Sequence, residues 1–374
     1  MNNFHLQVTD FNWAHTVNDA VNCRNDICLL FVGKLNWFGT QHWEKHCLSW
    51  YKKIRKDFKG KISVKLLVWG LDITTSGGWA NFLSGYGDIY SKLGLGNSWR
   101  EIDNNKTEQA KHVRDWLEQQ TSQPKLDSRK FIAYCNKCFS FADEVKIYTI
   151  NPNDVKKDLD TSEDLGYMWQ HLQLTQALKL YPDMFDDLAN ESSVIRTRYD
   201  VVMHDYVYNS PVNLGNLFYH MFSRQSGYAN RFTGENMYNY PTVMFANLPK
   251  LPGQQKTTSN TTIRELFLPN DVVLWFNAQG IKTYAQTYDK WAISKVPTGN
   301  NIYTLPIHQG LGGFFLKNNY NTIDISPMGY TDEFDGVLGS PLRYYYDDKY
   351  DDYRTRWYQG HRQILDKLLE KFSC

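Results

Sequence analysis

Two apolar runs near the N-terminus, separated by an amphipathic segment, constrain the fold of this chain more than any other feature. Residues 26–33 form a continuous apolar run that ends in glycine, as a strand buried on both faces does. Residues 62–69 repeat this pattern, and residues 43–58 between them have the spacing of a helix with one apolar face. A strand–helix–strand unit is right-handed by default and makes its two strands parallel. The sequence therefore predicts an α/β protein with a parallel sheet.

The carboxyl ends of these two strands carry the first candidate binding residues. Gly33 and Lys34 follow the first strand, and Gly70-Leu71-Asp72 follows the second. Ligands of open parallel sheets bind beyond the carboxyl ends of the strands. Lys34 and Asp72 are therefore candidates for ligand contact, and the alternative is an ordinary turn glycine beside an exposed charge.

A third apolar run, residues 191–205, has charges inside it. Arg196, Arg198 and Asp200 stand among valine, isoleucine and tyrosine, and their spacing of two places them on one face of a strand. Charges inside a sheet need a partner charge, a metal or a phosphate to offset their desolvation. Two guanidinium groups and a carboxylate suit a bound anion with a divalent cation. The alternative is an internal Arg–Asp ion pair that fixes local structure.

Composition excludes several classes of function. The net charge of +1 gives no reason to expect a nucleic-acid partner. No stretch is apolar for long enough to predict a transmembrane helix, and the first residues lack the pattern of a signal peptide, so a cytoplasmic protein is expected (of the host cell, if the chain is viral). The 15% aromatic content favours carbohydrate chemistry only slightly. The lone Cys-x-x-Cys, Cys135 to Cys138, lacks a second pair for zinc, so reduced structural thiols are predicted.

The segment from 168 to 205 carries a resemblance to a known family. Residues 168–181 have the pattern of a helix that contains several glutamines, and a connector then leads to the strand Val-Ile-Arg-Thr-Arg-Tyr-Asp-Val-Val. This arrangement resembles the WavE-like lipopolysaccharide-synthesis glycosyltransferases and their viral and phage relatives. The resemblance implies a GT-A-like Rossmann-type fold, with a mixed, mostly parallel sheet flanked by helices. It also implies a nucleotide-sugar donor and Mn²⁺ or Mg²⁺.

The resemblance also implies roles for individual residues. Gly33, Lys34 and Asp72 would lie near the nucleotide, and Arg196 and Arg198 near the diphosphate. For the metal, Asp200 is preferred over Asp158-x-Asp160, because Asp200 stands in an apolar strand whereas the other two precede a helix. His308 is a candidate further metal ligand, and the alternative is a structural histidine.

No single residue stands out in the sequence as a catalytic base. Asp205, at the end of the charged strand, and Asp271 are both candidates, besides the catalytic role given to Asp200. Inversion and retention of the sugar's configuration both stay open.

The remaining chain divides by pattern. Residues 131–134 and 145–150 are predicted strands, residues 154–164 a loop, and residues 269–284 a short helix, a glycine stop and a strand. Residues 206–262 are irregular and long enough for an acceptor-recognition insertion. One continuous domain is expected, with residues 1–205 binding the nucleotide sugar and residues 206–374 binding the acceptor.

The sequence thus predicts a glycosyltransferase that moves a sugar from a nucleotide-sugar donor to a glycan or a lipid-linked saccharide with help from a metal ion. The alternative is a non-catalytic carbohydrate-binding or virion-associated protein, which would need no nucleotide. A nucleotidyltransferase ranks last, because the segment after Gly33 is too short for the glycine-rich loop that such enzymes use.

Overall fold

The computed structural model describes a little under half of the chain. The described residues are 5–7, 26–35, 38–39, 43–57, 60–70, 92–95, 105–121, 127–158, 169–189, 192–203, 241–245, 271–293, 311–312, 314–315, 318–324, 339–341 and 366–372. Asp72, Asp160, Asp205 and His308 lie outside them, as does almost all of the expected acceptor insertion.

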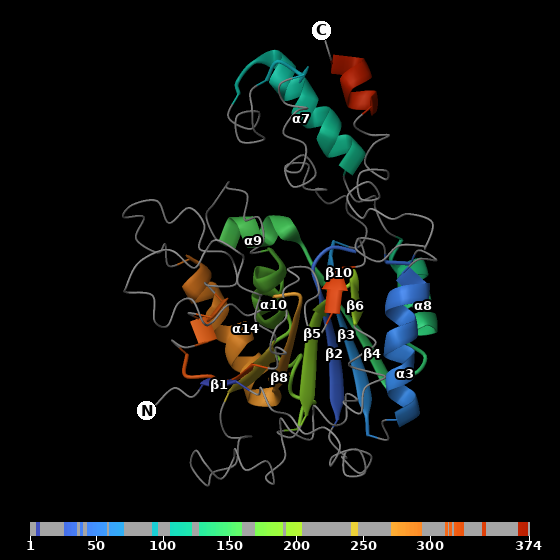
Figure 1. Ribbon diagram of the computed structural model, residues 1–374, viewed down its shortest axis with the longest axis vertical. Coiled ribbons are helices and arrows are strands. Elements are labelled where there is room, and N and C mark those ends of the chain that lie inside the picture. Colours follow the sequence, from blue (N-terminus) through green and yellow to red (C-terminus); the bar gives the residue numbers. More distant parts are fainter. Residues whose placement is uncertain are drawn as a thin grey trace. The chain divides into compact units, whose positions relative to one another are not determined.

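An eight-stranded mixed sheet forms the centre of the fold (Figure 1). Every neighbouring pair of strands is parallel except the two pairs that include β8. In spatial order the strands are β1 (His5–Gln7), β9 (Asn321–Asp324), β7 (Thr242–Phe245), β8 (Val273–Asn277), β5 (Ser193–Arg198), β2 (Ile27–Val32), β3 (Ile62–Trp69) and β4 (Glu144–Ile150).

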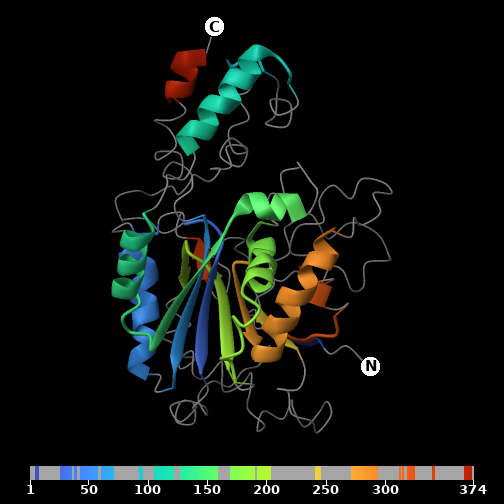
Figure 2. The ribbon, with the colours of Figure 1, turned by 180° about the vertical axis from the view of Figure 1, so that it is seen from behind.

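Helices cover both faces of this sheet, and the two figures agree on their sides (Figures 1 and 2). The π-helix η2 (Glu44–Leu48), which continues into α3 (Ser49–Asp57), and α8 (Ser128–Cys138) lie on one face. Helices α10 (Trp169–Leu180) and α14 (Ala278–Ile293) lie on the other. The short helix α9 (Pro152–Asp158) follows β4. The predicted α/β fold, with a mixed, mostly parallel sheet flanked by helices, is confirmed.

The alternation of side chains divides the core between these two layers. Leu30, Val194 and Phe276 belong to the cluster that α10 and α14 complete. Phe31 points to the opposite face, where its ring lies 5.1 Å from that of Tyr51 in α3. All these side chains are buried, because parallel strands with helices on both faces have no solvent side.

Three segments differ from their prediction. Residues 131–134 are helical, within α8, because the side chain of Asp127 caps the helix by accepting a hydrogen bond from the backbone N–H of Lys130 at 2.8 Å. Residues 154–158 lie in α9 instead of a loop. Residues 271–284 have the reverse of the predicted order, since strand β8 comes first and helix α14 follows without a stop at Gly280.

The charged run also departs from one continuous strand. Strand β5 ends at Arg198, Tyr199 and Asp200 form a turn, and β6 (Val201–Met203) pairs with β10 (Gly339–Pro341) in a separate two-stranded sheet. The turn lies at the carboxyl edge of the main sheet.

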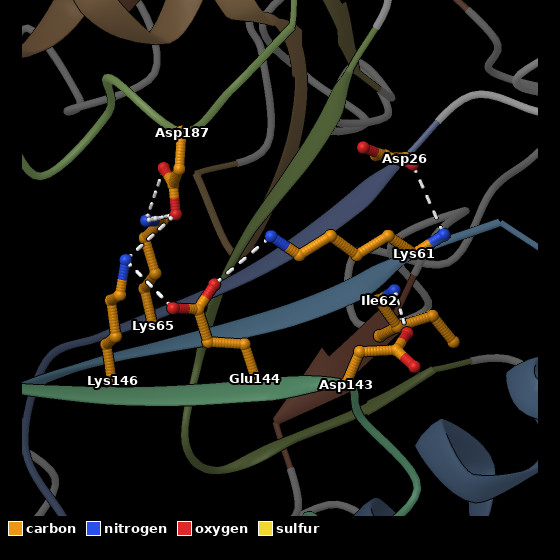
Figure 3. A network of polar contacts seen from close by, with 8 residues as sticks. All are labelled: Asp26, Lys61, Ile62, Lys65, Asp143, Glu144, Lys146 and Asp187. Atoms are coloured by element: carbon orange, nitrogen blue, oxygen red, sulfur yellow. Dashed lines mark hydrogen bonds and ion pairs between the residues drawn. The ribbon is translucent and has the colours of Figure 1, made fainter.

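At the amino ends of the central strands, side-chain carboxylates accept hydrogen bonds from backbone N–H groups of the neighbouring strand (Figure 3). Asp26 accepts a hydrogen bond from the backbone N–H of Lys61 at 3.2 Å, and Asp143 accepts one from that of Ile62 at 2.8 Å. Further along the same strands, Lys65 extends to Asp187, which lies between α10 and β5. These direct contacts join β2, β3 and β4 at this edge of the sheet.

The chain divides into two compact units. Unit 1 comprises Met1–Trp69 and Ile132–Leu342 and contains both sheets, and unit 2 comprises Gly70–Phe131 and Arg343–Cys374. In unit 2 the helix α7 (Glu108–Thr121) packs against a helix at residues 366–372, with the rings of Trp116 and Phe372 6.0 Å apart. The division into a donor half and an acceptor half is one of function and stays a prediction.

Within the described part of the chain, no helix combines the length and the apolar character that crossing a bilayer requires.

Candidate functional site

The strand order creates a topological switch point between β2 and β5. From β2 the chain proceeds to β3 and β4 on one side, and β5 then lies on the other side of β2. Helix α3 connects β2 to β3 over one face, whereas α10 precedes β5 on the opposite face. The strand order thus reverses between β2 and β5, and ligands of open α/β sheets bind at such points, outside the carboxyl ends of the strands.

Gly33 and Arg198 meet at this point. Val32 pairs with Arg198, so Gly33 follows β2 directly beside the end of β5. Gly33 has a φ of +96°, and a Cβ built on it would lie 3.8 Å from Cγ of Arg198. The absence of a side chain at Gly33 therefore lets its backbone turn in a left-handed conformation beside the stem of the arginine.

Arg198 and Asp200 form a two-bonded ion pair. Nε of Arg198 donates to Oδ1 of Asp200 at 2.9 Å, and Nη2 donates to Oδ2 at 2.6 Å. The aspartate side chain is 7% exposed and the arginine side chain 24% exposed, so the guanidinium covers the carboxylate. Planar two-bonded pairs of this kind are the strongest that arginine makes. The Arg–Asp ion pair that the sequence left open as the alternative is present, and it lies at the carboxyl edge of the sheet.

Arg196 does not join this pair. It is fully buried, and its Nη1 donates to the backbone carbonyl of Asp271, which links β5 to the start of β8. The two arginines therefore contact different groups, although both belong to one face of β5. The donor-binding role expected for Arg196 stays a prediction.

Asp271, a candidate base, lies at the same edge as Asp200. Val273 pairs with Thr197 in the antiparallel β5–β8 ladder, so Asp271, two residues before Val273, comes level with Tyr199, two residues after Thr197. Asp271 is 8% exposed. Lys34 is partly buried after Gly33, as expected for a residue at the end of β2.

The structure adds three residues that the sequence did not single out. Gln173 is fully buried in α10, accepts a hydrogen bond from the backbone N–H of Gly33 at 2.6 Å and donates one to the carbonyl of Leu67 at 2.9 Å. The hydroxyl of Tyr199 donates to the same carbonyl at 2.9 Å, and the indole of Trp43 donates to the carbonyl of Tyr199 at 2.6 Å. A glutamine amid the apolar residues of a buried helix was the available signal.

Burial raises the pKa of Tyr199 well above its ordinary value. The phenol therefore stays protonated at physiological pH and keeps its hydrogen bond to Leu67. Its role at the edge is that of a fixed hydrogen-bond donor, since a phenol with so raised a pKa keeps its proton and has no basic oxygen anion to offer.

The described residues do not form a complete metal site by themselves, because no three His, Cys, Asp or Glu side chains among them gather around one point. Asp200 presents one carboxylate, whose two oxygens retain lone pairs beyond the bonds from Arg198. One carboxylate suits a Mg²⁺ ion that takes its other ligands from phosphate and water.

Comparison with known proteins gives solved structures only. No family model and no curated protein matches the chain. Among solved structures, the galactosyltransferase LgtC in complex with donor and acceptor sugar analogs has a TM-score of 0.37 at 8% identity, over 93% of this chain and 96% of LgtC. An active-site mutant of LgtC has a TM-score of 0.36 with the same identity and coverage. At this degree of similarity the likeness decides nothing about this chain, whose function must be argued from its own residues.

Proposed function

We propose that the chain is a glycosyltransferase, which transfers a sugar from a nucleotide-sugar donor to a glycan or a lipid-linked saccharide. The observation that carries the proposal is the placement of Gly33, Arg198 and Asp200 together at the switch point between β2 and β5. The sequence resemblance over residues 168–205 supports the class of reaction, since its charged strand is the strand that ends there.

The residues at this edge suit a nucleoside diphosphate. Arg198 presents a partly exposed guanidinium whose planar shape matches phosphate oxygens. Gly33 has no side chain, so a phosphate or a sugar can approach the backbone closely there. When the sugar leaves, negative charge grows on the diphosphate, and fixed positive charge stabilises that state.

A divalent cation, Mn²⁺ or Mg²⁺, would supply further neutralisation of the leaving diphosphate when bound. Asp200 would hold it, and His308, outside the described residues, remains the second candidate ligand. Asp205 and Asp271 remain the candidates for accepting the proton of the acceptor hydroxyl, and Asp271 lies at the appropriate edge by its register.

The competing proposal is a non-catalytic carbohydrate-binding or virion-associated protein. The Arg198–Asp200 pair favours it in one respect, because each charge already has a partner and needs no ligand to offset its desolvation. The two proposals differ in whether Asp200 is required for binding a nucleotide.

A thermal-shift series separates them. The wild type, Asp200→Asn and the exposed control Asp186→Asn are heated with UDP, GDP, CMP or dTDP, with Mn²⁺ or with a chelator. A nucleotide at 100 times its Kd stabilises the native state by about 2.7 kcal/mol, which is visible as a shift in Tm. The glycosyltransferase proposal predicts a Mn²⁺-dependent shift with one nucleotide, lost in Asp200→Asn and kept in Asp186→Asn.

Two results would contradict the proposal. If no nucleotide shifts the wild type, the carbohydrate-binding proposal replaces it. If Asp200→Asn lowers the Tm but still responds to nucleotide and Mn²⁺ as the wild type does, the Arg198–Asp200 pair is a structural ion pair only.

A further inference from the structure

The ladder of backbone hydrogen bonds between β2 and β3 lacks its last bond. The backbone N–H of Ile27 donates to the carbonyl of Lys61 at 2.9 Å, and Ile27 pairs with Ile62. In a parallel ladder this pattern repeats every second residue along each strand. The pairing continues in register to Phe31 and Leu66, so the next donor is the N–H of Gly33 and its acceptor would be the carbonyl of Leu67.

The carboxamide of Gln173 stands between these two groups. Its Oε1 accepts from the N–H of Gly33 at 2.6 Å, and its Nε2 donates to the carbonyl of Leu67 at 2.9 Å. One side-chain amide thus replaces one backbone hydrogen bond and satisfies both of the groups that the bond would have joined. Because an amide now separates them, the carboxyl ends of β2 and β3 are farther apart than a ladder permits.

Tyr199 holds the opened end from the opposite face. Its hydroxyl also donates to the carbonyl of Leu67, at 2.9 Å, and its ring stacks on Phe31 with centroids 5.6 Å apart. The carbonyl therefore accepts one bond from α10 and one from the end of β5. The arrangement joins α10, β3 and β5 around the point where β2 ends at Gly33.

A buried glutamine is a costly way to end a ladder, because its side chain loses rotamer freedom and its polar atoms must all be paired. A direct bond from Gly33 to Leu67 would need no side chain at all. The use of Gln173 sets the position of Gly33, whose φ of +96° is outside the range of a strand residue, and Gly33 in turn lies against Arg198.

We infer that Gln173 is a positioning residue of the nucleotide-sugar site, whose carboxamide keeps the ends of β2 and β3 apart and fixes Gly33 beside Arg198. The inference rests on the proposed function, since it assigns Gln173 to the same site. Gln173 acts through Gly33 and the strand ends, and no contact with substrate is assigned to it.

The test compares Gln173→Met with Gln176→Met, its control one turn along the same buried helix. Methionine has nearly the length of glutamine but forms neither hydrogen bond. Binding of the nucleotide identified in the thermal-shift series is measured by calorimetry with Mn²⁺, at a temperature where near-UV circular dichroism shows every variant folded. We expect Gln173→Met to weaken the Kd by about 10- to 100-fold, because a small misplacement of binding groups has effects of that size, and Gln176→Met to stay within about 2-fold of the wild type.

Gln173→Asn provides the second variant in case Gln173→Met does not fold. It keeps the carboxamide but is one methylene shorter, so it cannot bridge both groups, and the same loss of nucleotide affinity is expected. A role in stability alone would lower the Tm and leave the Kd unchanged.

The outcomes distinguish failure of the Gln173 inference from failure of the proposed function. If the wild type binds a nucleotide and the Gln173 variants bind it equally well, or Gln176→Met loses as much affinity, the inference is overturned and the proposed function stands. If the wild type binds none, the proposed function fails and the inference fails with it.

Discussion

A lysine and an arginine are buried in one row across the sheet, and they bond to different kinds of group. Lys65 and Arg196 both pair with Leu30, one from β3 and one from β5, and both are fully buried. Arg196 donates to a backbone carbonyl, whereas Nζ of Lys65 lies 2.8 Å from both carboxylate oxygens of Asp187. Lys65 therefore depends on a single charged residue, which makes that residue a sensitive point of the fold.

Asp187→Asn should be among the most destabilising single changes in unit 1. It leaves the ammonium of Lys65, whose side chain is 1% exposed, without its carboxylate. Because the Asp187 side chain is 22% exposed, the loss should fall below the cost of breaking a fully buried pair, which is about 3–5 kcal/mol. Urea unfolding of wild type and variant measures the difference. Lys61→Met is the control, because the Lys61–Glu144 pair is 43% and 32% exposed and such surface pairs contribute only about 0–1 kcal/mol. Equal losses in the two variants would show that burial does not set the strength of this contact.

The same pair has a defined pH dependence. Burial alone raises the pKa of Asp187, but hydrogen bonds and charges from Lys65 and Lys146 outweigh it, so the pKa in the folded state is lowered. A lowered pKa contributes stability above the unfolded value of about 4, and this contribution is lost as the pH falls through the folded value. The cost of Asp187→Asn should therefore be constant from about pH 5 upward and should shrink below about pH 4.

Single residues show how far the sequence alone can predict this site. The sequence placed Arg196, Arg198 and Asp200 on one face and left an Arg–Asp ion pair as the alternative, because charge inside an apolar strand implies a partner. It did not show that Arg198 is the arginine that pairs. Gln173 was missed as a site residue, because its role depends on the separation between β2 and β3, which no local pattern encodes. Local chemistry can be predicted from the sequence, whereas contacts between distant segments cannot.

At the scale of elements, Gly280 explains why residues 269–284 were predicted in the wrong order. A glycine in an apolar pattern indicates a helix stop, but here it stands in the first turn of α14, where its N–H donates to the side chain of Asn277 at 2.7 Å. Glycine is required at this position because of another element, since a Cβ here would lie 2.5 Å from the carbonyl of Thr242 in β7. The strands 26–33 and 62–69 were predicted well because their signal, a buried apolar run, is local.

Gly280→Ala should destabilise the protein although alanine favours a helix by about 1 kcal/mol over glycine. The new methyl group meets backbone atoms of β7, which are not free to rotate away, so α14 or the strand must shift. Overpacking of this kind costs about 1–3 kcal/mol. Chemical denaturation measures it, with the exposed neighbour Gln279→Ala as a control that should change stability by no more than about 0.5 kcal/mol. A neutral or stabilising Gly280→Ala would mean that the contact between α14 and β7 is looser than described.

At the scale of the whole molecule, the four described cysteines lie on the two faces of the main sheet, so their reactivity can monitor each face. Cys28 belongs to the core on the α10 and α14 side, whereas Cys47, Cys135 and Cys138 belong to elements on the other side, and all four are free and buried. That Cys135 and Cys138 are reduced structural thiols stays a prediction, to which their burial lends support. All four lie in unit 1, so their reactivity follows the unfolding of that unit alone.

Burial protects these thiols in two ways, by excluding reagent and by suppressing the reactive thiolate. Desolvation raises the pKa of Cys28 to about 11, so at pH 8 only about one molecule in a thousand carries the thiolate there. Desolvation also raises the pKa of Cys47, Cys135 and Cys138. In the native protein none of the four should react with a thiol reagent over minutes at pH 8.

Labelling across a urea gradient, followed by peptide mass spectrometry, then tests whether the sheet unfolds as one unit. Both layers pack on the same strands, so losing either layer exposes a face of β2, β3 and β5 that water cannot stabilise. Cys28 on one side and Cys47 and Cys135 on the other should therefore become reactive with the same midpoint. A lower midpoint for Cys47 and Cys135 would show that the α3 and α8 layer separates first and would place the cooperative core of unit 1 on the α10 and α14 side.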